Sequence, residues 1–253
     1  MRDVRMQFDE KKVLEGLSLK VEPQDRLVIM GQSGSGKSTI LRLILGTLRP
    51  TAGSIFFKQF EITRLQRRKL QQVRRSIGMV YQYSALLSSR NVHDNVALPL
   101  EELTDKSPDE IDKIVDEKLE LVGMSGSKDL IPAELSGGMK KRASVARALV
   151  LEPEVMLFDE PSAGLDPVIG SVIDQLIISL TEKSKVTSII VTHEMDSAFR
   201  IGTRMAMLYQ GKVIEEAEPE KFKESENPVV AQFLSGSTEG PILEDSQDAI
   251  TKK

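Results

Sequence analysis

The chain has 253 residues, of which 40% are hydrophobic and 28% charged, a balance typical of a globular protein large enough to bury a full core. The formal net charge of −4 argues against binding nucleic acid through bulk positive charge, so we expect no nucleic-acid partner. The absence of cysteine excludes disulfides and thiolate chemistry. Because the sequence shows neither a run of about 18 uncharged apolar residues nor a signal-peptide pattern, we expect a cytosolic protein that reaches a membrane only through a partner.

The first fifty residues predict strands followed by a helix. Val4, Met6 and Phe8 alternate with polar residues, as expected for a half-buried strand. The continuous apolar run at 26–30 suits a buried parallel strand, and it leads directly into a glycine-rich loop. The apolar stretch after that loop predicts a helix that ends near Gly46.

Helices and strands alternate along the rest of the chain. The sequence predicts short strands at 51–63, a basic helix or loop at 64–76, strands at 77–82, 155–159 and 188–193, and an amphipathic helix around 172–180. Between about 85 and 150 the pattern is helical, and Ser107, Pro108 and Glu110 form a capping-box signal for one helix start. This order indicates an α/β fold with a mainly parallel sheet and a helical insertion. The segment 236–253 is polar and acidic, and we expect it to be a mobile or partner-bound tail.

The glycine-rich loop matches the pattern G-x-x-x-x-G-K-[ST], with a buried strand before it and a helix after it. Its glycines let backbone N–H groups converge on a phosphate, and the helix N-terminus adds the positive end of its dipole. We expect Lys37 to neutralise the terminal phosphates and Ser38 to ligate Mg²⁺. A chance glycine loop is the alternative, which the flanking strand and helix disfavour. The predicted nucleotide-binding residues are Gly31, Ser33, Gly34, Ser35, Gly36, Lys37, Ser38 and Thr39.

Two adjacent acids stand at the end of a predicted buried strand. Asp159 and Glu160 follow the apolar run VMLF, at the sheet edge where ligands bind in such folds. We expect Asp159 to hold Mg²⁺ through water, and Glu160 to act as the general base on the attacking water. The alternative, that Glu160 is a surface acid, is weakened by Pro161, which ends the strand and fixes the carboxylate at the edge.

Polar residues end two more predicted strands. Gln82 follows the run IGMVY, and His193 follows the run IIVT. Because parallel strands end at one edge of a sheet, we expect His193 to hydrogen-bond the γ-phosphate and Gln82 to contact Mg²⁺ or the lytic water. A lone Gln or His at a strand end is usually structural, and that alternative stays open. The other histidine, His93, lies in a loop-like stretch and is assigned a structural role.

The order and spacing of these motifs resemble those of ATP-binding-cassette (ABC) ATPase subunits. The matching elements are the glycine loop at 31–39, Gln82, LSGGMKKR at 135–142, the run VMLFDEP, SAGLD at 162–166 and His193, which together span nearly the whole chain. The resemblance implies a P-loop NTPase fold with a mainly parallel core sheet, an N-terminal antiparallel β subdomain and an ABC-specific helical insertion. It places a nucleotide-binding domain over residues 1–235, with the helical subdomain at about 85–150, before the tail at 236–253.

The resemblance also implies a head-to-tail dimer that binds ATP and Mg²⁺ between two copies of the chain. In such a dimer, Ser136, Gly137 and Gly138 of one copy face the γ-phosphate held by the other copy's loop, so that a helix N-terminus stabilises the anion from the opposite side. By resemblance, Asp166 lies at the dimer seam and couples the two sites, and Phe8 stacks on the adenine base. A plain core position is the competing interpretation of Phe8.

Three separated stretches, LSGGMKKR, DEPSAGLDP and residues 227–242, resemble the ATPases of Mla-type phospholipid transporters and their plastid relatives. The resemblance implies integral membrane permease subunits, an MCE-type lipid-binding protein and a small cytosolic regulatory subunit as partners. It implies a location on the cytoplasmic side of a bacterial inner membrane, or the stromal side of a plastid inner envelope. The alternatives are an ABC importer ATPase for a small nutrient and a soluble ABC ATPase of cluster assembly. Lys140 and Lys141 are expected on a solvated helix face.

Two surface features have candidate roles. We expect the segment 82–95 to form the coupling surface for the permease, with Tyr83, Leu86 and Leu87 offering a groove to a partner helix. The basic run at 64–75 is compatible with anionic lipid headgroups or nucleic acid, but charge runs usually serve solubility. We therefore interpret that run as solvated surface.

Overall fold

The structure, a computed structural model, describes residues 1–244, and its centre is a six-stranded sheet. The strands are β3 (Arg26–Met30), β7 (Ile77–Val80), β8 (Val155–Asp159), β9 (Thr187–Val191), β10 (Arg204–Tyr209) and β11 (Lys212–Ala217). Their order is β11-β10-β3-β9-β8-β7, with β11 antiparallel to β10 and every other neighbouring pair parallel. The predicted mainly parallel sheet is therefore confirmed.

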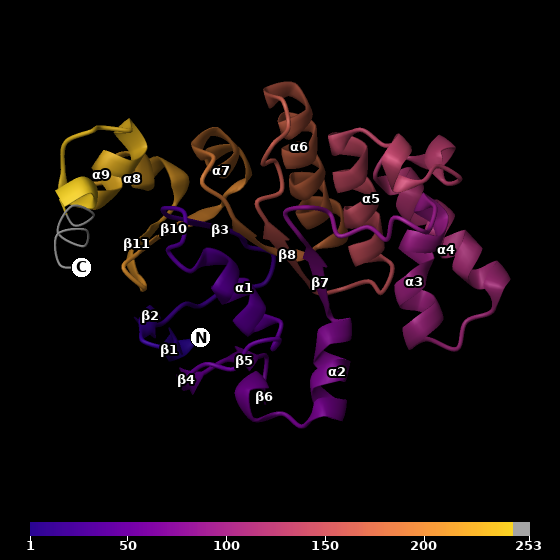
Figure 1. Ribbon diagram of the computed structural model, residues 1–253, viewed down its shortest axis with the longest axis horizontal. Coiled ribbons are helices and arrows are strands. Elements are labelled where there is room, and N and C mark those ends of the chain that lie inside the picture. Colours follow the sequence, from indigo (N-terminus) through magenta and orange to yellow (C-terminus); the bar gives the residue numbers. More distant parts are fainter. Residues whose placement is uncertain (245–253) are drawn as a thin grey trace.

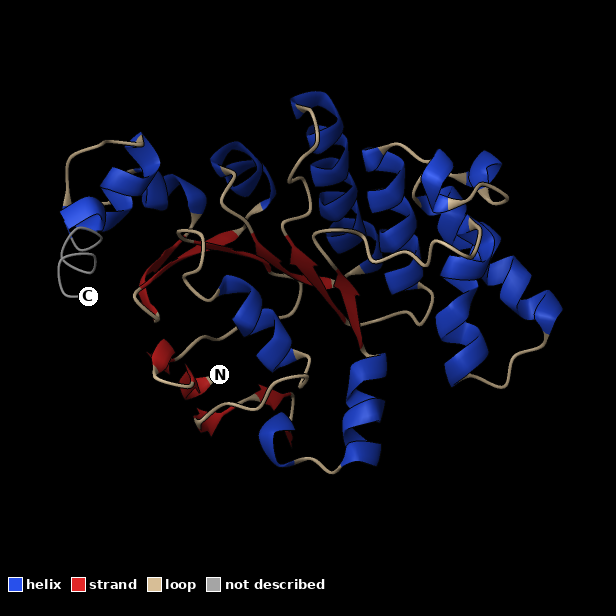
Figure 2. Ribbon diagram, viewed as in Figure 1, coloured by secondary structure: helices blue, strands red, loops and turns tan. Residues whose placement is uncertain are grey.

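Helices cover both faces of this sheet (Figures 1 and 2). On one face lie α5 (Gly137–Leu149), α6 (Pro167–Ser184), α7 (Met195–Ile201), α8 (Pro219–Lys223) and α9 (Pro228–Ser235), and on the other lie α1 (Lys37–Ile44) and α2 (Arg67–Arg75). Successive residues of β3 enter opposite cores: Val28 and Met30 pack with the first group of helices, whereas Leu27 and Ile29 pack with α1. Burial on both faces explains why this strand is apolar along its length.

An antiparallel β subdomain lies beside the sheet, below it in Figure 1. It contains β1 (Arg2–Phe8), β2 (Lys11–Leu17) and β4 (Ala52–Ser54) in the order β2-β1-β4, and the hairpin of β5 (Phe56–Phe57) and β6 (Phe60–Glu61), which the 3₁₀ helix η1 (Ile62–Arg64) follows. The alternation predicted for β1 holds at Val4 and Met6, which are buried. At the end of the strand, Phe8 is instead exposed.

The helical insertion forms the end of the molecule opposite α8 and α9 (Figure 1). It comprises α3 (Val92–Leu103), α4 (Pro108–Leu121), the 3₁₀ helices η2 (Ser125–Ser127) and η3 (Pro132–Glu134), and α5. The start of α4 is where the capping-box pattern predicts it, because the backbone N–H of Ser107 donates to the Glu110 carboxylate at 2.8 Å. Insertion and sheet share one hydrophobic core, which holds α5 against β7 and β8.

The chain after α9 folds back onto the domain as far as the structure describes it. Gly236 ends α9 in the left-handed conformation, at φ +66°, which glycine adopts without strain. The backbone N–H of Ile242 donates to Gln232 Oε1 at 2.8 Å, and the Ile242 side chain is buried. Residues 245–253 of the predicted tail lie outside the described residues. Within residues 1–244, no helix combines the length and the apolar character needed to cross a membrane.

Candidate active site

Four adjacent parallel strands, β3, β9, β8 and β7, bring the predicted site residues to one edge of the sheet. The glycine loop follows β3, His193 follows β9, Asp159 ends β8 with Glu160 next, and Gln82 follows β7. Parallel strands share a carboxyl edge, so the loops that leave them meet even though Gly31 and His193 lie far apart in the chain. The predicted convergence at this edge is therefore confirmed.

The glycine loop has the backbone expected of a phosphate cradle. Gly34 and Gly36 adopt φ values of +78° and +106°, and a Cβ added at Gly34 would meet no atom within 4 Å. Within residues 1–244, the hydroxyl of Ser35 is the one buried side-chain polar atom that lacks a hydrogen-bond partner. Such a donor normally has a partner, and a phosphate oxygen in the cradle would supply one. The loop therefore fits a phosphate group.

Lys37 begins α1 and is almost fully buried. Its ammonium donates to the carbonyls of Gly31, at 2.7 Å, and Gln32, at 3.0 Å, and lies 4.0 Å from Oε1 of Glu160. Burial lowers the pKa of Lys37, and the nearby carboxylates of Glu160 and Asp159 oppose that shift. The positive charge is thus held at the mouth of the cradle, where a phosphate would neutralise it.

Ser38 and Asp159 form the part of the site suited to a cation. The Ser38 hydroxyl donates to Asp159 Oδ1 at 2.8 Å, linking α1 to the end of β8. Burial raises the pKa of Asp159, while this hydrogen bond works against the increase. Among the described residues, no group of three or more His, Cys, Asp or Glu side chains can hold a metal by itself. A hydroxyl and one carboxylate are nevertheless a fitting donor set for Mg²⁺, which usually completes its shell with phosphate oxygens and water.

Glu160 sits in a constrained position beside these groups. Its φ of +49° is rare for a residue with a side chain, and its backbone N–H donates to the Val191 carbonyl at 2.9 Å. The residue is 8% exposed, and its two carboxylate oxygens lie 2.9 Å from Nδ1 and 3.3 Å from the backbone nitrogen of His193. The His193 side chain is itself 58% exposed. One end of the imidazole therefore holds the carboxylate, while much of the ring remains open to solvent.

Lys141 was missed by the sequence reasoning, and the expected solvated position for it is wrong. The residue is 4% exposed, and its ammonium donates to the backbone carbonyls of Gln82, at 2.5 Å, and Glu160, at 3.0 Å. Burial lowers its pKa to about 8, against the influence of Asp159, Glu160 and Glu194. Helical periodicity contained a signal, because Lys141 shares the spacing i, i+3, i+4 with the buried Ser144 and Val145. Lys140 is half-buried.

The second glycine motif caps α5. Ser136 is exposed, and its hydroxyl accepts the Met139 backbone N–H at 3.2 Å, which leaves the first turn of the helix facing outward. A Cβ at Gly138 would lie 2.4 Å from the Ile169 side chain, so only glycine fits against α6 there. Within residues 1–244, no hydrogen bond or ion pair joins residues 136–138 to the glycine loop at 31–39. The two motifs are separate in one copy of the chain.

Two further predicted residues have clear positions. Asp166 caps α6, where its carboxylate accepts the backbone N–H groups of Val168 and Ile169, each at 3.1 Å. Phe8 is 42% exposed, so the competing core interpretation does not hold for it. Its hairpin lies against the glycine loop, because a Cβ at Gly36 would touch Val13 of β2 at 3.0 Å. An exposed ring on the hairpin that lies against the glycine loop is suited to stacking on a base.

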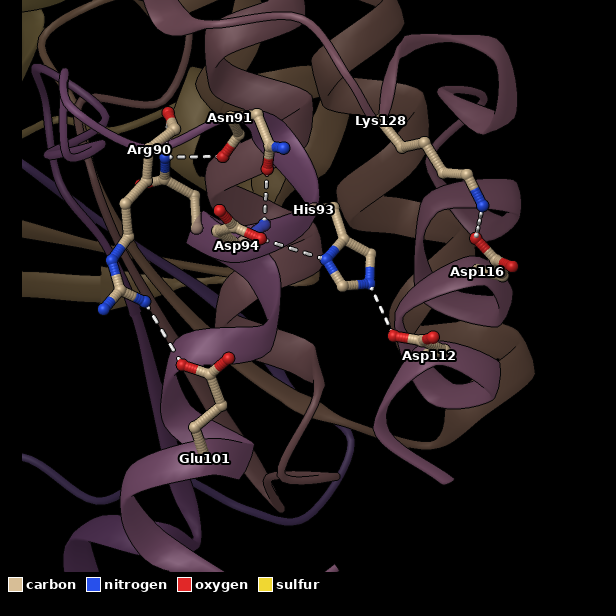
Figure 3. A network of polar contacts seen from close by, with 9 residues as sticks. Arg90, Asn91, His93, Asp94, Glu101, Asp112, Asp116 and Lys128 are labelled. Atoms are coloured by element: carbon tan, nitrogen blue, oxygen red, sulfur yellow. Dashed lines mark hydrogen bonds and ion pairs between the residues drawn. The ribbon is translucent and has the colours of Figure 1, made fainter. Parts of the chain in front are cut away.

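His93 belongs to a structural network, as expected (Figure 3). Its ring lies 3.3 Å from Asp94 and 3.0 Å from Asp112, which joins α3 to α4. Arg90 pairs with Glu101, Lys128 pairs with Asp116, and Asn91 caps α3 around the same helices. These contacts hold the helices of the insertion together. His93 therefore has a structural role and none among the residues at the carboxyl edge of the sheet.

The predicted coupling surface is partly exposed. Tyr83 is 87% exposed and Leu87 is 42% exposed, so both are available to a partner. Leu86, by contrast, is half-buried and packs against the main core. A half-buried leucine can still line a groove, so the expectation that Leu86 faces a partner stays a prediction; the chain before it turns at Ser84 and Ala85, both at positive φ.

Comparison with known proteins identifies the family. The sequence pattern of the ABC transporter family matches residues 14–163. The probable ribonucleotide transport ATP-binding protein mkl of Mycobacterium leprae is 40% identical over 96% of this chain and 71% of its own length. The intermembrane phospholipid transport system ATP-binding protein MlaF of Haemophilus influenzae is 39% identical over 96% of this chain and 92% of its own length. The chloroplastic protein trigalactosyldiacylglycerol 3 of Arabidopsis thaliana is 38% identical over 95% of this chain and 74% of its own length.

Solved structures agree with this similarity in sequence. An ATP-binding cassette solved as a dimer in a post-hydrolysis state, bound to ADP and Pi, superposes with a TM-score of 0.79 at 31% identity, over 86% of this chain and 97% of that one. The cbiO1 protein of Clostridium perfringens, part of an ABC transporter complex, superposes with a TM-score of 0.82 at 30% identity, over 92% of this chain and 93% of that one. The predicted P-loop NTPase fold is confirmed. The chain is a member of the ABC transporter family and an ATP-hydrolysing subunit of such a transporter.

Proposed function

We propose that this ATPase works as a head-to-tail dimer that drives phospholipid movement through a membrane permease. Two relatives named as intermembrane phospholipid transport ATPases are 39% and 38% identical to this chain over 92% and 90% of their own lengths. The relatives named for ribonucleotide transport are 40% identical, but only 71% and 68% of their lengths align. Similarity along nearly the whole of both chains favours the phospholipid substrate.

The glycine loop would hold the phosphates of ATP. Its backbone N–H groups, the Ser35 hydroxyl and the Lys37 ammonium are the donors that converge there, and Phe8 would stack on the adenine. Ser38 and Asp159 would hold Mg²⁺, with Gln82 as a third contact. When bound, the ion neutralises charge that develops on the phosphate oxygens.

The hydrogen bond between Glu160 and His193 is the observation that carries the proposed chemistry. In the proposed mechanism, Glu160 takes the proton of the attacking water, because its carboxylate is held by a ring nitrogen and by the backbone of His193. The exposed part of His193 then stabilises the γ-phosphate, and Lys37 neutralises its charge. The three groups lie at one sheet edge, so water attack and charge stabilisation occur on the same phosphate.

A second copy would complete each site. Within residues 1–244, no hydrogen bond or ion pair joins residues 136–138 to the glycine loop of the same chain, yet both have the backbone geometry that binds anions. Twofold symmetry places the motif of each copy against the loop of the other and gives two sites per dimer, with Asp166 near the seam. ATP then joins the copies, and its hydrolysis releases them, which converts chemistry into motion.

The remaining partners belong to the membrane side of the system. Tyr83 and Leu87 offer an exposed apolar patch to a helix of the permease, and residues 82–91 connect this patch to the active site. A lipid-binding MCE-type protein and a small regulatory subunit complete the proposed assembly, which would sit on the cytoplasmic side of a bacterial inner membrane or on the stromal side of a plastid inner envelope. An importer of a small nutrient is the alternative, supported by the names of the mkl relatives. A soluble ATPase of cluster assembly is the remaining alternative.

The Glu160→Gln variant tests the catalytic proposal. We expect ATP turnover to fall by about 10²–10⁴-fold while ATP binding persists, because the amide keeps the shape but cannot accept the proton. The ATP-bound variant should then elute as a dimer in gel filtration. Hydrolysis within about tenfold of the wild-type rate would remove Glu160 from the role of base.

Purification with the membrane partner tests the transported substrate. Mass spectrometry of the purified complex should find phospholipid enriched over detergent-solubilised membrane, and ATP turnover should change when phospholipid is withdrawn from the reconstituted vesicles. Stimulation by ribonucleosides without a response to lipid would favour the nutrient alternative. Recovery of the chain without any membrane protein would favour the soluble one.

A further inference from the structure

Lys141 connects three parts of the active site through one buried ammonium. It lies in the second turn of α5, five residues after Ser136, whose helix N-terminus would face the nucleotide of the partner copy. Its ammonium donates to the carbonyl of Gln82, 59 residues away in the chain, and to the carbonyl of Glu160, 19 residues away. Neither carbonyl belongs to a helix or a strand, so neither receives a hydrogen bond from regular secondary structure.

Both carbonyls belong to segments that need external support. Glu160 has a φ of +49°, a conformation that costs free energy in any residue with a Cβ and persists only where its surroundings hold it. The peptide groups around it are held on both sides, since its N–H donates to Val191 and its carbonyl accepts from Lys141. Loss of the ammonium would leave a buried carbonyl with one weak donor, the Ala163 N–H at 3.4 Å.

A second cation of α5 holds the continuation of the Gln82 segment. The two guanidinium NH₂ groups of Arg147 donate to the carbonyls of Ser84, at 2.8 Å, and Ala85, at 2.7 Å. Ser84 and Ala85 also adopt positive φ, at +61° and +51°. Helix α5 therefore presents Lys141 and Arg147 to one strained loop, and Lys141 alone reaches across to Glu160.

We propose that Lys141 is a positioning residue that fixes the backbone of Gln82 and Glu160 and joins both to the helix that carries residues 136–138. It touches neither the glycine loop nor the bonds that change in the reaction. A shift of the 136–138 helix on contact with the partner copy's nucleotide would move this ammonium, and with it the proposed base of its own site. The inference rests on the proposed role of Glu160, and it gives the two composite sites of a dimer a direct mechanical link.

The Lys141→Met variant tests the proposal, because methionine fills a similar volume without a donor. We expect kcat for ATP hydrolysis to fall by about tenfold to 10²-fold, because a displacement of the base by about 1 Å lowers the rate by a factor of this order. The affinity for ATP, measured by titration with a fluorescent analogue, should change less than about twofold because the glycine loop is intact. Lys141→Arg, which keeps charge and two donors, should recover most of the rate.

Lys140→Met is the matched control, since it removes the same charge one residue earlier from a half-buried position. It should retain near-wild-type kcat. An equal loss of kcat in Lys140→Met and Lys141→Met would overturn the proposal, as would an unchanged kcat in Lys141→Met. If Lys141→Met does not fold, the comparison moves to Lys141→Arg, whose failure to exceed about 10% of wild-type kcat would count against the proposal.

Hydrogen exchange distinguishes a local loss of backbone positioning in Lys141→Met from a general loss of structure. It also tests the positioning independently of the proposed role of Glu160 as base. In Lys141→Met, the backbone amides of Ser84 and Glu160 should exchange faster, whereas amides of the sheet, such as those of β3, should keep wild-type protection. Unchanged protection at residues 82–85 and 160 would contradict the inference even if kcat fell. If Glu160→Gln retained turnover, the proposed function of Glu160 would fail instead, and the exchange result would still stand as a test of the positioning.

Discussion

The Nδ1 atom of His193 lies 2.9 Å from Oε1 of Glu160. The two residues follow the ends of neighbouring parallel strands, β9 and β8, and are 33 residues apart in the chain. The hydrogen bond pairs a carboxylate that is almost completely buried with a ring that is more than half exposed. Through this contact, His193 would orient the proposed base and also offer an exposed ring to the phosphate. The role of His193 can therefore be tested, with His93 as a comparison.

Replacement of His193 by alanine should lower ATP turnover by about 10²-fold, because it removes one stabilising donor and frees the Glu160 carboxylate. The measurement is phosphate release at saturating ATP. His93→Ala is the control: it breaks the link between α3 and α4 but leaves the carboxyl edge of the sheet unchanged. Equal losses in the two variants would indicate that His193 acts on stability rather than on the reaction.

The Ser38→Ala variant should need a higher Mg²⁺ concentration for half-maximal hydrolysis. The hydroxyl that lies 2.8 Å from Asp159 is a proposed ligand of the ion, and alanine offers no oxygen in its place. We expect about a tenfold shift, one ligand being worth on the order of 1–2 kcal/mol. Thr47→Ala, which removes a hydroxyl bonded to the Arg42 carbonyl after α1, serves as the control. A Mg²⁺ dependence identical to that of the wild type would exclude Ser38 as a ligand.

The Phe8→Ala variant should raise the KM for ATP by about tenfold with little change in kcat. Stacking of a base on an aromatic ring contributes about 1–3 kcal/mol, and it acts equally on ground state and transition state. Phe8→Trp should keep the wild-type KM. Phe60→Ala removes a ring of similar exposure, 39% against 42%, from a different hairpin and should leave the KM unchanged. A lower kcat at unchanged KM in Phe8→Ala would argue against stacking.

A buried ion pair between α6 and α7 should contribute to stability. Asp174 is fully buried, accepts the Ser197 hydroxyl at 2.7 Å and pairs with Arg200. Arg200→Met should lower the free energy of unfolding by about 2 kcal/mol at neutral pH, because it strands a buried carboxylate. Arg5→Met, which breaks an exposed pair with Asp3, should cost less than about 0.5 kcal/mol in the same urea titration.

The deficit of Arg200→Met should also depend on pH. Burial raises the pKa of Asp174 above the ordinary 3.8, and Arg200 opposes that increase in the wild type. When folding raises the pKa of an acid, the folded protein gains stability at a pH below the ordinary pKa of that acid. This gain disappears as the pH rises through the raised pKa. The difference in stability between wild type and Arg200→Met should therefore shrink as the pH falls from 7 towards 4.5. A difference that is independent of pH over this range would contradict the charged-pair explanation.

Much of the site could be predicted because its residues follow local patterns. The glycine loop, the acids after VMLF and the polar residues at strand ends each stand beside an apolar run whose period indicates a strand or a helix. Parallel pairing then brings strand ends together without further information. Ser136 was placed in the same way, because a cap followed by helix formers predicts an exposed helix start.

The contacts that Lys141 and Leu86 make could not be assigned from local patterns. A lysine three residues after a pair of glycines at a helix start indicates a solvated helix face, yet the hydrogen-bond partners of Lys141 are carbonyls 59 and 19 residues away, and only the packing of α5 against β7 and β8 brings them within reach. Leu86 packs partly against the main core, and it follows Ser84 and Ala85, which adopt positive φ and whose carbonyls accept hydrogen bonds from Arg147. Local hydrophobic periodicity was therefore enough to predict which residues stand at the ends of strands and helices. The backbone groups that the buried cations hold follow instead from the folded packing, since they depend on burial and on contacts between distant segments.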